Sequence, residues 1–160
     1  LAKIVRKEDP NFPNATIVEE EALLPSATVE RAFPQFSPDG KELAFIEDRT
    51  RLMVVNLDTK KVRQITGSTW YSTSGGVDYA WAPDGKWFTL EFIGNRHDPY
   101  SDIGLVSAQG NSPIINLTNS GYMSGSPRFA LDGNAILFKT ERYGMRAHAS
   151  WGSQLSLIHI

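Results

Sequence analysis

"FSPDGK", residues 36–41, is the stretch that decides the fold, because it returns as "WAPDGK" at residues 81–86 and as "FALDGN" at residues 129–134. Each copy keeps an aromatic residue, a small residue, a turn centre and an Asp-Gly pair in the same order. The turn aspartates of successive copies are 45 and 48 residues apart. That period is longer than those of leucine-rich, ankyrin and tetratricopeptide repeats. The chain is therefore predicted to be an array of repeated structural units.

The apolar residues between the turns come in short runs that are rich in β-branched and aromatic types. Examples of these runs are Leu43–Phe45, Leu52–Val55, Val62–Ile65 and Ile103–Val106. Runs of this length and composition are typical of strands. The units are therefore predicted to be built from β-strands, and no helix is required anywhere.

The repeated turn explains how consecutive strands are joined. Pro38 presets φ at the first corner of a type I turn, Asp39 tolerates the second corner, and Gly40 takes the left-handed conformation that lets the chain return. A second hairpin follows in each unit, at residues 57–60 in one copy and 108–111 in the next. Each unit is therefore predicted to contain four antiparallel strands.

Four-stranded units at this period predict an all-β fold of the β-propeller type, in which each unit is one blade. The predicted organisation is a part-blade at 2–24, complete blades at 33–66 and 78–118, and a part-blade at 126–153. Propeller rings usually have four to eight blades, so about three to three and a half blades would leave strand edges and apolar faces unpaired. We therefore expect the chain to be a fragment of a β-propeller within a longer polypeptide.

The last residues of the chain, 154–160, do not follow the repeat. A third strand of the last part-blade is expected to begin near Trp151–Ser153, but the "LSLIHI" that ends the chain carries neither a turn nor a repeat position. It is similar to a translated cloning or sequencing-adapter sequence. Residues 154–160 are therefore predicted to be a non-native tail, and they are excluded from the fold prediction.

The composition argues against several classes of partner. The formal net charge is −2, from 16 basic and 18 acidic side chains, and this balance does not predict nucleic acid as a partner. The longest apolar runs have about five residues, whereas a membrane-spanning helix needs about 20, so no membrane span is predicted. The chain has no cysteine, which excludes disulfides and cysteine-based zinc sites and is compatible with either an exported or a cytosolic protein.

The repeat also carries a resemblance to a known family. It joins an aromatic-small-Pro-Asp-Gly-Lys turn and Leu-Ala-Phe to an apolar strand with Asn-Leu and a final Ile-Thr, as in "FSPDGKELAF" and "LMVVNLDTKKVRQIT" at residues 36–45 and 52–66. This pattern resembles the TolB and tricorn type of β-propeller repeat, and the resemblance extends from Pro34 to Ser153. The third copy departs from it, because Leu131 stands in place of proline and weakens the preset turn.

The stretch "FKTERYGMRAHASWGS", residues 138–153, is similar to the loop and strand that follow the same turn in tricorn-like serine peptidases of bacteria. In those proteins a propeller precedes a PDZ-like module and a peptidase domain. The resemblance implies a non-catalytic propeller segment that binds peptides or unfolded polypeptide and guides them toward a peptidase domain outside this chain. It favours the periplasm or cell envelope, with the cytoplasm as the alternative location.

A second hypothesis comes from a different class of protein. In it the chain belongs to a TolB-like propeller scaffold for protein–protein interaction in the cell envelope, with no enzyme attached. Propellers of this type serve many proteins, so the repeat specifies the fold and leaves the function open. The reading frame beyond Ser153 distinguishes the two hypotheses, since only a peptidase would continue into PDZ-like and peptidase domains.

No catalytic residue, metal site or cofactor is predicted within the chain. The catalytic serine and histidine of the resembled peptidases belong to a domain that nothing here matches. His97, Asp98 and Ser101 lie close in sequence, but a catalytic triad is defined by its spatial geometry, and the cluster is interpreted as a polar turn. No nucleophile elbow, Walker loop or zinc-binding helix motif occurs.

The strand order predicts two rims. The turn rim carries both kinds of hairpin, and the loop rim carries the links between blades and the loops between second and third strands. One of these loops, at residues 93–102, is long, because 19 residues separate the turn aspartate from the third strand in its blade and 13 in the preceding blade. Aromatic and arginine side chains on loops are common anchors of recognition. The candidate binding residues on the loop rim are Trp70, Tyr71, Arg96, His97, Tyr100, Tyr122, Arg142, Tyr143 and Arg146, with Met123 and His148 beside them.

Overall fold

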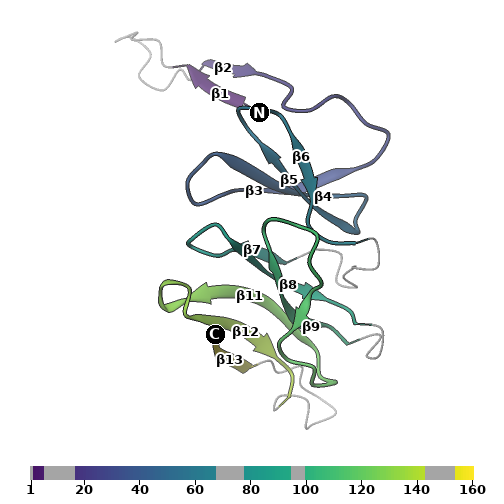
Figure 1. Ribbon diagram of the computed structural model, residues 1–160, viewed down its shortest axis with the longest axis vertical. Helices are drawn as coiled ribbons and strands as arrows, with labels where there is room; N and C mark the ends of the chain where they lie inside the picture. Colours follow the sequence, from purple (N-terminus) through teal and green to yellow (C-terminus); the bar gives the residue numbers. More distant parts are fainter. Residues whose placement is uncertain (1, 6–16, 68–77, 95–99, 143–153) are drawn as a thin grey trace.

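The computed structural model describes residues 2–5, 17–67, 78–94, 100–142 and 154–160 of the chain. These residues form four antiparallel sheets, and their only helical element is a 3-10 turn, η1, at Leu131–Gly133. Figure 1 shows the sheets following one another along the long axis of the molecule, with the N-terminal sheet at one end and the C-terminal sheet at the other. The predicted all-β fold of antiparallel blades is therefore confirmed.

The strands of each sheet are neighbours in the order in which they occur along the chain. A separate two-stranded sheet contains β1 (Ala2–Val5) and β2 (Ile17–Glu20). Blade one contains β3 (Arg31–Phe36), β4 (Glu42–Glu47), β5 (Arg51–Asn56) and β6 (Val62–Gln64). Blade two contains β7 (Tyr79–Trp81), β8 (Trp87–Phe92), β9 (Asp102–Ser107) and β10 (Ile115–Asn116). Blade three contains β11 (Ser124–Ala130), β12 (Ala135–Thr140) and β13 (Gln154–His159).

The Pro-Asp-Gly turn of blade one is closed by backbone and side-chain hydrogen bonds. The Gly40 N–H donates to the Ser37 carbonyl at 2.9 Å, and Gly40 has a φ of +70°, as the sequence predicts. Asp39 Oδ1 accepts from Ser37 Oγ at 2.7 Å and from the Lys41 N–H at 3.1 Å. The Ser37 hydroxyl and then the Lys41 N–H hold the pKa of the Asp39 carboxyl below its usual value. This stabilisation is therefore present at neutral pH and is lost as the pH falls through the lowered pKa.

Blade three closes the equivalent hairpin in a different conformation. Leu131 and Asp132 have φ values of +51° and +54°, and Gly133 has +92°. The Asn134 N–H donates to the Leu131 carbonyl at 3.0 Å. A proline ring fixes φ near −65°, so this turn cannot form with proline at position 131. The leucine therefore changes the conformation of the turn, whereas the sequence predicted only a weaker form of the same turn.

We expect Leu131→Pro to destabilise the chain, although it restores the residue found in the other two copies. Proline cannot adopt the left-handed φ of this position, and the loss should be about 1–3 kcal/mol in the free energy of unfolding, measured by urea denaturation. Pro38→Ala is the matched change in blade one, where φ is ordinary, and should remove only about 0.4–1 kcal/mol. A gain in stability for Leu131→Pro would contradict this account of the turn.

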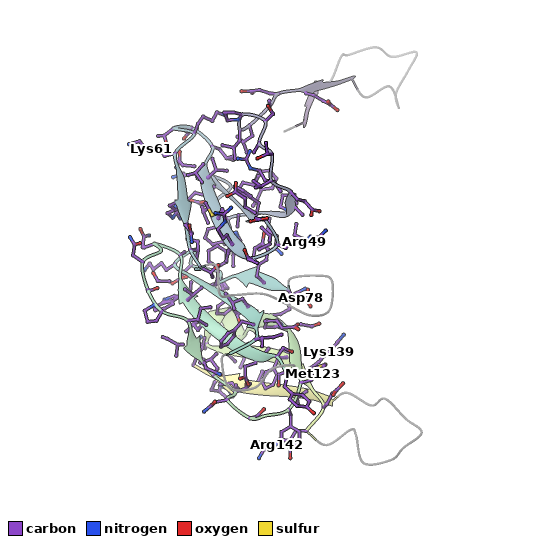
Figure 2. The ribbon with its side chains drawn as sticks, turned by 90° about the vertical axis from the view of Figure 1, so that its right-hand side faces the viewer. Arg49, Lys61, Asp78, Met123, Lys139 and Arg142 are labelled. Carbon is purple, nitrogen blue, oxygen red and sulfur yellow. The ribbon has the colours of Figure 1, made fainter. Side chains whose placement is uncertain are left out.

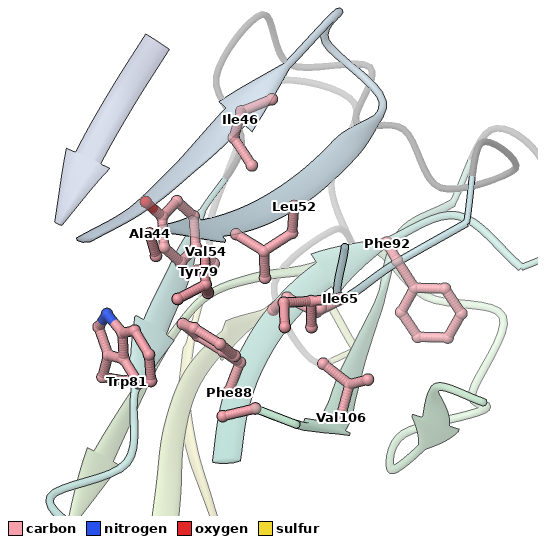
Figure 3. Close-up of a cluster of buried hydrophobic side chains, with 12 residues drawn as sticks. Ala44, Ile46, Leu52, Val54, Ile65, Tyr79, Trp81, Phe88, Phe92 and Val106 are labelled. Atoms are coloured by element: carbon pink, nitrogen blue, oxygen red, sulfur yellow. The ribbon is translucent and has the colours of Figure 1, made fainter. Parts of the chain in front are cut away.

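Among the described residues, the larger of two hydrophobic cores lies between blade one and blade two, as Figure 3 shows. Blade one contributes Ala44, Ile46, Leu52 and Val54, and Ile65 follows its last strand. Blade two contributes Tyr79, Trp81, Phe88, Leu90, Phe92 and Val106, with Ala108 after β9. These residues alternate along their strands, so one face of each sheet meets the neighbouring blade.

Hydrogen bonds between the innermost strands reinforce this packing. The Tyr79 hydroxyl donates to the Phe33 carbonyl, and Gln35 Nε2 donates to the Tyr79 carbonyl at 3.0 Å. Burial raises the pKa of Tyr79, so its hydroxyl remains a donor at neutral pH. The inner strands β3 and β7 are therefore joined by polar contacts at the same place where the blades share their core.

A second core joins blade two to blade three. Ile103 of β9 packs with Ile136 and Phe138 of β12. Partly buried apolar residues surround them, namely Leu105, Leu117, Phe129 and Ile158. Each pair of successive blades therefore uses the same mode of packing, sheet face against sheet face.

The threonine that ends each complete unit has a structural role. Thr66 Oγ1 accepts a hydrogen bond from the Leu52 N–H at 2.9 Å, and Thr118 Oγ1 accepts one from the Ile103 N–H at 3.1 Å. In both blades the hydroxyl therefore satisfies a backbone donor of the third strand after the fourth strand has ended. This explains why Ile-Thr and Leu-Thr recur at the ends of the units.

The C-terminal residues differ from the sequence-based expectation. Residues 154–159 form β13, which pairs with β12 from Thr140↔Gln154 to Ala135↔His159. The repeat pattern indicated no strand in this segment, so β13 is an element that the sequence analysis did not foresee. The reason is that β12 offers a second edge of backbone donors and acceptors, and a short apolar run can pair with such an edge without a turn signal. Whether this sequence is native stays a prediction.

Candidate functional site

The two rims predicted from strand order are both present among the described residues. On the turn rim, the Leu57 N–H donates to the Lys41 carbonyl at 2.9 Å, and the Ala108 N–H donates to the Lys86 carbonyl at 2.8 Å. The two hairpins of each complete blade therefore lie side by side. Figure 2 shows Lys61 of the turn rim on one side of the molecule and, on the other side, the loop-rim residues Arg49, Asp78, Met123 and Arg142.

Three loop-rim segments of blades two and three are held together by hydrogen bonds. The Ser124 N–H donates to the Ser101 carbonyl and the Ser101 hydroxyl donates to the Ser124 carbonyl, both at 2.9 Å. Ser124 Oγ donates to Thr140 Oγ1 at 3.4 Å, and the Glu141 N–H donates to the Met123 carbonyl at 3.0 Å. The end of the 93–101 loop, the link between the blades and the end of β12 thus meet at one corner.

Large side chains that adjoin these bonded residues face solvent. Tyr100, Tyr122 and Met123 are 44%, 45% and 38% exposed, and Arg142 is exposed beside them in sequence. Such residues combine apolar area with a hydroxyl, a thioether or a guanidinium, and they are common in surfaces that bind polypeptide. The corner is therefore an aromatic and basic surface on a backbone held in place by hydrogen bonds. We call it the loop-rim corner.

The structure places some of the predicted binding residues and leaves others untested. Tyr100, Tyr122 and Arg142 come from three different segments, and the chain brings these segments to the loop-rim corner. The other candidates lie outside the described residues, so their positions stay predictions: Trp70, Tyr71, Arg96, His97, Tyr143 and Arg146, together with His148.

Ser101 is buried and its hydroxyl is used in a structural hydrogen bond. The residue is only 2% exposed, and its hydroxyl donates to the Ser124 backbone carbonyl. A nucleophile needs a hydroxyl that a substrate can reach and a base that accepts its proton. The burial and the hydrogen bond of Ser101 therefore do not support a role as a nucleophile. His97 and Asp98 lie outside the described residues.

Sequence reasoning missed a polar cluster on the innermost strands. Ser126 Oγ donates to Asp78 Oδ2 at 2.9 Å, and Arg128 Nη2 lies 3.8 Å from Asp78 Oδ1. Asp78 and Ser126 each stand six residues before the turn aspartate of their copy, so aligning the copies outside the turn could have found this pair. The cluster links β11 to the start of β7 near the loop rim.

A cavity was also missed, on the turn rim. It has a volume of about 370 Å³, lies between the turns of blades two and three, and has Pro83, Trp87 and Phe129 among its lining residues. Trp87 follows the repeated turn directly, and that position was the only signal in the sequence. Ile160 also lines the cavity, so part of its wall comes from the segment predicted to be a non-native tail.

The described part of the chain contains no group of three or more His, Asp or Glu side chains arranged to hold a metal ion. Within the same residues, no helix has the length and apolar composition required to cross a membrane. The candidate functional surfaces among the described residues are the loop-rim corner and the turn-rim cavity.

Solved structures of other proteins share this arrangement of sheets. No protein-family profile matches the chain. The crystal structure of the tricorn protease aligns with 80% of the chain at 20% identity and a TM-score of 0.56, covering 12% of that structure. The β-propeller domain of the Trilobed protease from Pyrococcus furiosus aligns with 92% of the chain at 15% identity and a TM-score of 0.55, covering 43% of that domain. The chain is thus a β-propeller segment built from antiparallel blades.

Sequence relatives specify the family. A protein of Sulfurisphaera tokodaii described as a tricorn-like protease C-terminal subunit is 30% identical over 107 residues, which are 67% of this chain and 12% of the relative. The uncharacterized peptidase YuxL of Bacillus subtilis is 26% identical over 125 residues, covering 70% of this chain and 17% of the relative. The chain is a propeller segment of the tricorn-like peptidase type, and it spans less than a fifth of the length of these curated relatives.

Proposed function

We propose that the chain is a non-catalytic part of a tricorn-like serine peptidase, and that its loop rim binds peptides or unfolded polypeptide and guides them toward a peptidase domain elsewhere in the parent polypeptide. The observation that carries the proposal is the loop-rim corner. There Tyr100, Tyr122 and Met123 are exposed on segments fixed by the Ser101, Ser124 and Thr140 hydrogen bonds. A surface whose backbone is already ordered loses less entropy when it binds a partner.

The chemistry of the corner fits an extended polypeptide. Tyrosine rings and a methionine thioether can contact many different side chains, and the Arg142 guanidinium can bind backbone carbonyls or carboxylates. Such contacts favour binding of any exposed, extended polypeptide over binding of one particular sequence. The names of both sequence relatives refer to proteases or peptidases, which supports this reading over the TolB-like scaffold, and the scaffold hypothesis stays an untested alternative.

We expect Tyr122→Ala, made in the intact parent polypeptide, to weaken capture of an unfolded protein by about 1 kcal/mol or more, which is at least about a fivefold rise in Kd. Turnover of long substrates should slow by a similar factor. A short chromogenic peptide that reaches the active site unaided should be cleaved at the normal rate. The measurements are titration of a permanently unfolded, fluorescently labelled protein and steady-state cleavage of both substrates.

Lys86→Ala is the matched control, because Lys86 is exposed on the turn rim. It should leave capture and both cleavage rates unchanged. Equal loss on long and short substrates for Tyr122→Ala would indicate a defect in folding or catalysis, contrary to a role in guiding. No loss on either substrate would show that the loop-rim corner is a structural surface.

A further inference from the structure

The turn-rim cavity lies between two equivalent turns, those of blade two and blade three. Its volume of about 370 Å³ is within the range of about 300–1,000 Å³ that is usual for ligand pockets. Blade two contributes Asp84, Trp87 and Leu105 to its lining, and blade three contributes Phe129 and Asp132. The cavity is therefore large enough to hold a side chain of another molecule between two blades.

The equivalent place between blades one and two is bridged by a charged pair. Arg63 Nη2 donates to Glu42 Oε2 at 2.6 Å, and Arg63 Nε donates to the Ala108 carbonyl of blade two at 2.8 Å. Glu42 begins β4 directly after the Pro-Asp-Gly turn, so the bridge lies at the turn-rim end of this interface. The two side chains therefore occupy space that would otherwise be open between the blades.

Blade two has apolar residues at both of these places. Trp87 corresponds to Glu42, since each stands six residues after the aromatic residue that begins its copy of the repeat. Ile115 of β10 takes the register position that Arg63 has in β6. An indole and an aliphatic side chain cannot form an ion pair, so blade two cannot bridge to blade three in the same way.

The aromatic residue that begins each copy also differs between the two interfaces. In blade two it is Trp81, whose Nε1 donates to the Gln35 carbonyl of blade one at 3.4 Å. In blade three it is Phe129, which has a smaller ring and no N–H group. The hollow between blades two and three is therefore explained by two differences between the copies, the lost ion pair and the smaller ring.

The lining of the cavity combines apolar walls with acidic groups. Trp87 is 37% exposed, while Leu105 and Phe129 are partly buried. Asp84 and Asp132 lie in the two turns and are exposed to solvent. Among the described residues, no lysine, arginine or histidine lines the cavity. The site is therefore complementary to a cation carried on an apolar stem.

We propose that the turn-rim cavity is a binding site for a lysine or arginine side chain of a polypeptide partner. The aliphatic stem of that side chain packs against Leu105 and Phe129. The charged group lies over the Trp87 ring and near the carboxylates of Asp84 and Asp132. None of these five residues belongs to the segment 154–160, so the proposal does not depend on whether that segment is native.

The test uses the indole N–H signal of Trp87 in nuclear magnetic resonance spectra of the ¹⁵N-labelled 1–160 chain, identified by its loss in Trp87→Phe. The probe is the blocked tripeptide acetyl-Ala-Lys-Ala-amide. We expect a saturable shift of this signal, with a Kd about tenfold lower than for the norleucine peptide, which has the same stem without the charge. High salt should weaken binding of the lysine peptide, because the two carboxylates are exposed.

Two variants separate the charge of the site from its volume. Asp132→Asn removes one carboxylate, and asparagine tolerates the left-handed φ of +54° at this position. It should raise the Kd of the lysine peptide about threefold or more. Phe129→Trp introduces the side chain that blade two has at Trp81 and fills the cavity, so it should raise the Kd about tenfold or more. Asp58→Asn, in an exposed hairpin of blade one, removes the same charge at a distance and should leave the Kd unchanged.

Equal Kd values for the lysine and norleucine peptides would overturn the proposal, because the site would then not recognise a cation. An effect of Asp58→Asn as large as that of Asp132→Asn would also overturn it, since the attraction would come from the net charge. The dispersion of the amide signals reports the fold of each variant in the same spectra.

The intact parent polypeptide, labelled with 5-fluorotryptophan, provides a second measurement through the ¹⁹F signal of Trp87. The lysine peptide should shift this signal there too, and an unchanged signal would overturn the proposal, because another part of the parent would then fill the cavity. The proposal does not depend on the proposed function of the loop rim. Its failure would be seen at Trp87, whereas failure of the proposed function would be seen in the capture of unfolded protein by the Tyr122→Ala variant.

Discussion

Phe88→Ala is expected to lower the free energy of unfolding by about 3–5 kcal/mol, the range for removal of a large buried aromatic side chain. Phe88 is 0% exposed and belongs to the core between blades one and two. Its ring centroid lies 4.0 Å from that of Trp81 and 6.0 Å from that of Tyr79. The substitution therefore removes apolar contacts and an aromatic cluster at the place where the two blades meet.

Urea unfolding followed by tryptophan fluorescence measures this effect, since Trp81 adjoins the substituted ring. Phe36→Ala is the matched control in the 1–160 chain, because the same side chain is removed from an exposed position, and its effect should stay within about 0.5 kcal/mol. A loss below about 1 kcal/mol for Phe88→Ala would mean that the interface between the blades contributes little to stability.

Asp102→Ala is expected to lower the free energy of unfolding by about 2–3 kcal/mol, because it leaves several donors without their acceptor. Asp102 is 1% exposed and accepts hydrogen bonds from Asn116 Nδ2 at 2.8 Å, Thr118 Oγ1 at 2.6 Å and the Ser120 N–H at 3.3 Å. These bonds fix the start of β9 to the segment after β10. The carboxylate is therefore structural, although it lies close to the loop-rim corner.

Asp102→Asn separates the hydrogen-bonding role from the loss of side-chain volume. The amide keeps one acceptor oxygen, so the loss should be about 1 kcal/mol smaller than for alanine. Asp58→Ala is a suitable control, because Asp58 is exposed in a hairpin and its carboxylate should contribute within about 0.5 kcal/mol. Thermal unfolding of the four proteins checks the series, and an Asp102→Ala variant as stable as the Asp58→Ala variant would contradict this role.

The candidate site could be predicted from the sequence only in part. Tyr100, Tyr122 and Arg142 were assigned to one rim from strand order alone, because antiparallel strands of known sequence order fix which connections share an end. Their grouping at one corner depends on the hydrogen bonds of Ser101 and Ser124. Serine is common in polar loops, so nothing in the sequence marked these residues as the ones that hold the segments together.

By itself the sequence determined the strands of blades one and two, their order in each sheet and two of the repeated turns. These features depend on local chemistry: Pro38 and Gly40 restrict the backbone, and short β-branched runs disfavour helices. Because that information lies within a few residues, it can be read without knowing which segments meet.

Only the tertiary structure decided the features that depend on contacts between distant segments. This group includes the left-handed φ of Leu131 and the pairing of β13 with β12. It also includes the difference in exposure between Phe36, which faces solvent, and its equivalent Trp81, which is buried. Phe36 and Trp81 occupy the same position in the repeat. They differ in exposure because Trp81 packs into the core between blades one and two, whereas Phe36 belongs to neither hydrophobic core of the described residues. Burial is a property of the partner surface as well as of the residue, so the repeat pattern could not distinguish them.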